Sequence, residues 1–193
     1  MKRHPKTGRD RHIKMVIAGP ANCGKAEFTR ALAERNPQAQ VRDYKVGWLD
    51  VLRLDYVVPA NNAEEEPYDL SVHTLNGKVQ YEGMYEMLLS NADAVLMMID
   101  INPTRIQDSL EAMIKTADAL QKRGRDIRDV PMVFQYHRAE LASPQIVQQW
   151  DELLDLQTTA VPHYFSASNF AEGSFTGFDL LVKATISQLS NLT

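Results

Sequence analysis

The sequence predicts an α/β protein with a six-stranded, mostly parallel sheet, one antiparallel hairpin at its edge and about five flanking helices. One observation predicts this class, and a second predicts a single domain. Strand-like apolar segments alternate with helical segments along most of the chain, as in parallel sheets that helices cover on both faces. The chain has 193 residues, of which 44% are hydrophobic and 24% charged, which suits one globular domain.

The expected strands are short runs rich in apolar and β-branched residues. The run at 94–100 (AVLMMID) is apolar on both faces, as a central parallel strand should be. The polar, acidic stretch 61–67 separates two other runs and indicates the tip of a hairpin. In chain order, the expected strands are residues 12–19, 51–58, 69–75, 94–100, 131–136 and 163–166.

The expected helices lie between and after these strands. Apolar residues recur at helical spacing through 104–124, and Gly124 is a suitable stop signal. Ser143 as N-cap and Pro144 as first residue mark the start of a later helix. In chain order, the expected helices are residues 25–36, 85–89, 104–124, 144–156 and 175–189.

Charge is unevenly distributed along the chain. The formal net charge is −4, yet the first 14 residues contain six basic residues and one acidic residue. We therefore expect a basic, flexible arm at 1–11 and a single folded domain at 12–193. Such an arm could contact anionic lipid, nucleic acid or an acidic partner, but a solvated tail is the simpler interpretation.

Composition excludes several classes of protein. The single cysteine, Cys23, rules out an intramolecular disulfide framework and a cysteine-rich zinc site. No apolar run is long enough to cross a membrane, and the N-terminal residues lack the apolar core of a secretory signal. We therefore expect a cytoplasmic protein with no stable membrane anchor and no nucleic-acid partner.

Residues 19–26 (GPANCGKA) nearly match the phosphate-binding loop pattern G-x-x-x-x-G-K-[ST]. The two glycines let the backbone curl so that successive N–H groups point at phosphate oxygens, and the lysine adds a positive charge. Ala26 replaces the hydroxyl that would ligate magnesium, so we expect weak or absent magnesium binding. The expected phosphate contacts are Gly19, Asn22, Cys23, Gly24, Lys25 and Ala26.

This loop, the element order and four further segments resemble the Ras-like small GTPases, and most of all the bacterial gliding and polarity GTPases, the MglA family. The segments are DYVVP (55–59), HTLNGK (73–78), VPMVFQYHRAEL (130–141) and FSASNFAEG (165–173), and the similarity spans about residues 12–190. The resemblance implies a P-loop G domain that binds GTP or GDP. It also implies a role in cell polarity, gliding motility or signalling, with a roadblock-type regulator or an effector as protein partner.

The switch segments depart from the family at chemical positions. Gly77 could still offer its N–H to a terminal phosphate, whereas Lys78 replaces the glutamine that orients water. Lys78 could pair with phosphate or be an ordinary surface lysine. Val51 stands where the family has a threonine ligand to magnesium. The resemblance implies that Asp55, Tyr56 and Lys78 lie on the face that meets partners.

The base-reading segment also departs from the family. Residues 137–140 (HRAE) stand where the family has N-K-x-D, so Glu140 keeps a carboxylate, while His137 and Arg138 replace an asparagine and a lysine. In the Ser166-Ala167-Ser168 segment, the N–H of Ala167 would face the guanine carbonyl. The alternative is a surface loop that contacts no base.

Three functions fit these observations. The departures at four chemical positions favour a degenerate (pseudo-)GTPase that acts as a binding module in a polarity, motility or signalling assembly, with no catalytic residue and no metal ligand. An active but slow GTP hydrolase, completed by groups from a partner protein, is the first alternative. Another P-loop enzyme, such as a kinase, is the second.

Overall fold

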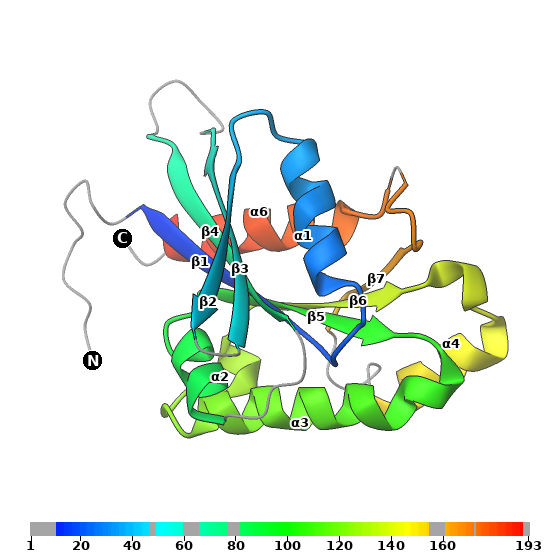
Figure 1. Cartoon of the computed structure of the whole chain (residues 1–193). Coiled ribbons are helices and arrows are strands. Elements are labelled where there is room, and N and C mark those ends of the chain that lie inside the picture. The colour runs from blue at the N-terminus through cyan, green and yellow to red at the C-terminus, as the bar shows by residue number, and fades with distance from the viewer. Residues whose placement is uncertain are drawn as a thin grey trace.

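The computed structural model describes residues 11–46, 49–59, 66–76, 82–154, 161–171 and 173–190. A central sheet is covered by helices on both faces (Figure 1). The strands are β1 (His12–Ala18), β2 (Gln40–Val46), β3 (Leu49–Val58), β4 (Tyr68–Asn76), β5 (Ala94–Asp100), β6 (Met132–His137) and β7 (His163–Ser166). The α-helices are α1 (Lys25–Glu34), α2 (Glu82–Leu89), α3 (Ile106–Gln121), α4 (Pro144–Leu153) and α6 (Thr176–Ser190). Three short 3-10 helices are η1 (Pro103–Arg105), η2 (Ile127–Asp129) and η3 (Ala139–Leu141).

The sheet has the order β2-β3-β4-β1-β5-β6-β7. Strands β4, β1, β5, β6 and β7 run parallel, whereas β2 and β3 are antiparallel to their neighbours. The predicted α/β class, the mostly parallel sheet and the hairpin made by β3 and β4 are therefore confirmed. The domain bounds that we predicted remain a prediction.

The predicted number of six strands is wrong, because β2 makes a seventh. Its sequence, QVRDYKV, mixes charged and apolar residues, and it pairs only with β3, from Gln40 opposite Asp55 to Val46 opposite Leu49. An edge strand is open to water along one side and can carry charges that keep it from pairing further. It therefore lacks the apolar run by which we recognised the other strands.

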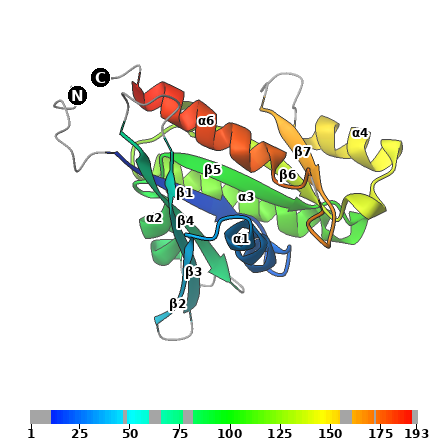
Figure 2. The same cartoon turned by 90° about the horizontal axis from the view of Figure 1, so that it is seen from above.

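Each face of the sheet carries its own apolar core. Figure 2 shows the helices that lie on either side of the strands. One core joins the sheet to α2, α3 and α4, and its buried side chains include Tyr85, Leu120 and Trp150. The other joins the sheet to α1 and α6 and includes Phe28 and Phe178. Strand β5 contributes to both cores and is buried throughout, as its two-sided apolar sequence predicts.

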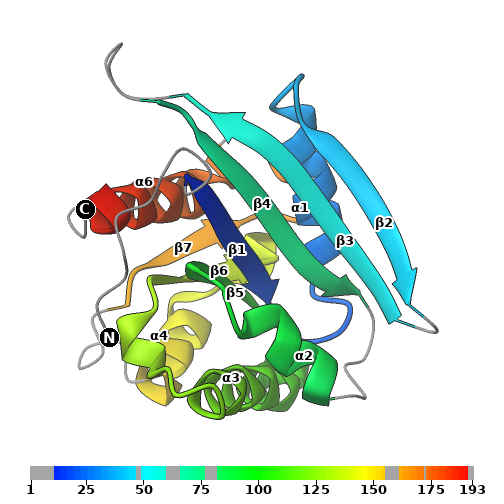
Figure 3. The same cartoon turned by 90° about the vertical axis from the view of Figure 1, so that its left-hand side faces the viewer.

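The parallel strands end at one edge of the sheet and thereby assemble the candidate site. Ala18 lies opposite Met97, Asp100 lies opposite His137, and His137 lies opposite Ser166. The loop after β1 and the ends of β5, β6 and β7 therefore meet, as is usual for ligand sites in parallel sheets. Away from this edge, β2, β3, β4 and β1 lie side by side, with α2 and α3 below them in Figure 3.

Candidate phosphate-binding site

The loop between β1 and α1 has the backbone geometry of a phosphate cradle. Gly19, Asn22 and Gly24 have φ angles of 143°, 57° and 84°, which glycine adopts readily and other residues rarely do. Neighbouring atoms exclude a side chain at both glycines. A Cβ at Gly19 would lie 2.4 Å from the carbonyl oxygen of Met98, and one at Gly24 would lie 2.6 Å from Nε2 of His137.

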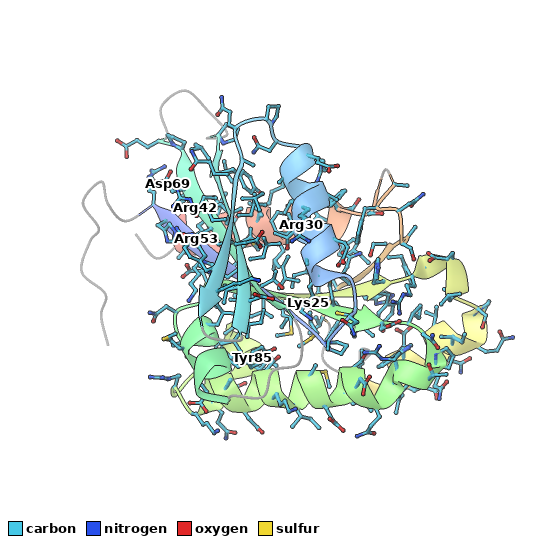
Figure 4. All side chains as sticks on the ribbon, in the orientation of Figure 1. Lys25, Arg30, Arg42, Arg53, Asp69 and Tyr85 are labelled. Carbon is cyan, nitrogen blue, oxygen red and sulfur yellow. The ribbon has the colours of Figure 1, made fainter. Side chains whose placement is uncertain are left out.

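Lys25 holds the first half of the loop. It starts α1 and is 5% exposed (Figure 4). Its Nζ donates to the carbonyl oxygen of Gly19 at 3.1 Å and also to that of Pro20. The third donor position of the ammonium faces Sγ of Cys23 at 3.8 Å, and sulfur is a weak acceptor that a phosphate oxygen could replace.

Two arginines hold the second half. Nη2 of Arg105, in η1, donates to the carbonyl oxygen of Ala21 at 2.7 Å. Nη2 of Arg138 makes a longer contact, 3.4 Å, with that of Asn22. Four successive loop carbonyls thus point at cationic side chains.

The backbone N–H groups of the loop are left for a ligand. In the part of the chain that the structure describes, no backbone carbonyl accepts from the N–H groups of residues 24–26. These groups lie at the N-terminus of a ten-residue helix, whose dipole favours an anion there. Unsatisfied amides, a helix N-terminus and Lys25 together make a site that fits phosphate oxygens.

Arg138 is anchored to the end of β5. Its Nη1 forms an ion pair with Asp100, whose side chain is completely buried, and the N–H of Asn102 donates to the other Asp100 oxygen at 3.2 Å. Arg138 itself has a φ of 66° at the end of β6. Asp100 therefore fixes the arginine that contacts the loop at Asn22.

The residues that the structure describes around the loop do not make a donor set for magnesium. Ala26 presents only a methyl group in the first turn of α1, and Val51 is paired between two strands in β3. The buried hydroxyls of Thr29 and Thr74 each donate to a backbone carbonyl. Across the described ranges, no three His, Cys, Asp or Glu side chains lie close enough together to hold a metal ion.

His137 is part of the packing around the loop. Its Nδ1 lies 3.1 Å from Oγ of Ser166, and its ring stacks on Phe170 at a centroid distance of 5.0 Å and an angle of 13°. Burial lowers the pKa of His137, and the nearby charge of Arg138 lowers it further, so the ring is neutral at pH 7. The imidazole links β6, the loop at Gly24 and the end of β7.

Glu140 is held by Ser168. One carboxylate oxygen accepts from the N–H of Ser168 at 3.1 Å, and the other accepts from its hydroxyl. These hydrogen bonds lower the pKa of Glu140, so the carboxylate is ionised at neutral pH. Ala167, between the two serines of this segment, is half-buried, and its carbonyl oxygen accepts from the N–H of Phe170. The structure thus brings together the loop, the base-reading segment and the Ser166–Ser168 segment.

Two of the residues predicted for the partner face, Asp55 and Tyr56, lie on opposite faces of β3. Asp55 accepts from Nε of Arg53 at 2.7 Å on one face of β3. Tyr56 packs on the opposite face, against the core of α1 and α6, where burial raises the pKa of its hydroxyl. Gly77 and Lys78 lie outside the described residues. A partner role for this group stays a prediction.

Sequence reasoning missed Asp100, Arg105 and Phe170. A carboxylate at the end of a strand that is apolar on both faces needs a cation as partner, and this signal could have indicated Asp100. Arg105 directly precedes α3, where a positive charge opposes the helix dipole and therefore suggests another role. Nothing in the sequence around Phe170 indicated its stacking on His137.

None of the helices that the structure describes is long and apolar enough to cross a membrane. No family model matches the chain. The mutual gliding-motility protein MglA of Myxococcus xanthus (strain DK1622) is 22% identical over 190 residues, which cover 95% of each chain. Together with the fold, this similarity confirms the predicted relationship to the Ras-like, MglA-like small GTPases.

Proposed function

We propose that this chain is a degenerate GTPase that holds nucleotide phosphates without hydrolysing the nucleotide, and that it acts as a binding module for a protein partner. One observation carries the proposal. The phosphate loop is folded and held by three cations, whereas Ala26 and Val51 stand where hydroxyl ligands to magnesium are expected.

Loss of the magnesium ligands should abolish hydrolysis, because the reaction of this fold depends on the metal ion. Phosphoryl transfer to water depends on a metal ion that neutralises developing charge and on a group that orients the water. The described residues supply neither, while the amide cradle needs no metal to bind an anion. Retained phosphate binding with lost hydrolysis is the combination that these residues support best.

The partner is inferred from the relative. That protein is named for mutual gliding motility, so we propose that this chain works in a bacterial polarity, motility or signalling assembly in the cytoplasm. A roadblock-type regulator or an effector would dock on the face of β2 and β3 that carries Arg42 and Arg53 (Figure 4). Asp55 lies on the same face of β3, two residues after Arg53. Since the Tyr56 side chain packs against the core of α1 and α6, Asp55→Asn is the variant that disturbs the fold less in a binding test with such a partner.

The test measures nucleotide binding and turnover separately. The purified protein is denatured and any released nucleotide is identified by ion-exchange chromatography. The stripped protein is then titrated with GDP, GTP and ATP, with magnesium or with EDTA, and GTP hydrolysis is followed under single-turnover conditions. We expect binding that EDTA leaves unchanged and no hydrolysis above the rate in buffer.

Three variants sharpen the result. Lys25→Ala should abolish binding, whereas Lys183→Ala, an exposed lysine on α6, should not. Ala26→Ser should restore a magnesium dependence. Strong magnesium dependence in the wild-type protein would contradict the proposal and support a slow GTPase, which should hydrolyse GTP once its partner is added.

A further inference from the structure

The carboxylate that would read a guanine base is already occupied within the chain. Both oxygens of Glu140 accept hydrogen bonds from Ser168, one from the backbone N–H and one from the hydroxyl. Hydrogen bonds to an ionised carboxylate are the stronger kind. A guanine would have to displace these donors or share the oxygens with them. Much of the binding free energy that guanine gains from Glu140 would therefore be offset by the hydrogen bonds lost to Ser168.

The other polar groups of the base-reading segment are engaged as well. His137 uses Nδ1 toward Ser166, and its Nε2 lies against Gly24. The ring face is covered by Phe170, which also packs edge-on against Phe28 at a centroid distance of 5.6 Å. His137 therefore has no ring nitrogen that could reach a base without rearranging this aromatic cluster.

Arg138, the third polar side chain of the segment, is engaged in contacts that hold the phosphate loop and is not available to contact a base. Its guanidinium spans the buried Asp100 and the carbonyl of Asn22, two contacts that fix the phosphate loop. The phosphate end of the site has free amides, whereas the side chains at the base end are satisfied. The two ends of the site therefore differ in what they can still bind.

We propose that the site recognises the phosphates and not the base, so its ligand is a nucleoside di- or triphosphate bound with little discrimination between bases, and that Ser168 determines this by occupying Glu140. The inference rests on the proposed phosphate-binding function. It assigns to Ser168 a specificity-determining role. It also separates the roles of Lys25, which meets phosphate, and Glu140, which contributes little while Ser168 holds it.

Calorimetric titration in EDTA with GDP, ADP, UDP and inorganic pyrophosphate tests the proposal. We expect the three nucleotides to bind the wild-type protein with affinities equal within about threefold, less than the worth of one hydrogen bond to a charged group. Ser168→Ala removes the hydroxyl donor and frees Oε1 of Glu140, while the backbone N–H stays on the other oxygen. The freed oxygen should raise the preference for GDP over ADP by about tenfold. Ser187→Ala, an exposed serine on α6, is the matched control and should change nothing.

Glu140→Gln separates the carboxylate from the fold. In the wild-type background it should change GDP affinity by less than about twofold, whereas in the Ser168→Ala background it should remove the gained preference. A wild-type preference for GDP of about a hundredfold would overturn the inference and leave the proposed phosphate binding intact. An unchanged preference in Ser168→Ala would overturn the role of Ser168. Failure of every ligand, pyrophosphate included, would overturn both the inference and the proposed function.

Discussion

Replacing Arg138 by Ala should destabilise the protein strongly, because it leaves the buried Asp100 carboxylate without its cationic partner. The Asp100 carboxylate is completely buried, and its described partners are Arg138 and one backbone N–H. Removing one member of a buried ion pair costs about 3–5 kcal/mol. The Arg138 side chain is 32% exposed, so water can enter on that side and we expect a loss of about 2–4 kcal/mol.

Urea unfolding of the wild-type protein, Arg138→Ala and the double variant Asp100→Asn/Arg138→Ala measures this effect. The double variant should recover at least half of the lost stability, because the neutral amide leaves no uncompensated charge. Arg123→Ala, at an exposed position after α3, is the control and should change stability by less than about 0.5 kcal/mol. A loss below about 1 kcal/mol in Arg138→Ala, or a double variant less stable than the single one, would refute the reasoning.

Three further predictions follow from single contacts. Gly19→Ala should lower the free energy of unfolding in urea by more than about 3 kcal/mol, because the new Cβ would lie 2.4 Å from a backbone oxygen. Gly124→Ala is the control: its Cβ would meet no neighbouring atom, so only the φ of 69° opposes it and the loss should be about 1–2 kcal/mol. Similar losses in the two variants would contradict the packing argument. Tyr85→Phe should cost about 1 kcal/mol, because it deletes the 2.6 Å hydrogen bond between α2 and α3; an unchanged melting temperature would contradict this. Burial, with the nearby charge of Lys14, lowers the pKa of His73 to about 4. In the unfolded state the same histidine takes up a proton near pH 6.5, so the free energy of unfolding should fall by up to about 3 kcal/mol between pH 6.5 and 4 and stay level above pH 7. His73→Asn should lack this pH dependence. An NMR titration that gives His73 of the folded protein a pKa near 6.5 would contradict the prediction.

Local patterns in the sequence were sufficient for the fold class and the phosphate loop. The strands that we recognised contain apolar residues in a local pattern that is typical of buried strands. The phosphate loop is also a contiguous pattern, in which the spacing of Gly19, Gly24 and Lys25 indicates the backbone conformation. We did not predict strand β2, because this edge strand is specified by its pairing with β3 and has no apolar run. The order and spacing of motifs also sufficed for the relationship to MglA.

Only the tertiary structure decided what surrounds the loop. Arg105 reaches a carbonyl 84 residues away, Arg138 pairs with a carboxylate 38 residues away, and Ser168 binds a carboxylate 28 residues away. Pairings of this kind leave no periodic trace in the sequence, because they depend on which strand ends the sheet brings to one edge. The opposite faces of Asp55 and Tyr56 follow from the alternation of neighbouring side chains along a strand. Whether Glu140 faces a base or a serine, in contrast, is decided by strand order and side-chain packing, not by the identity of the residues alone.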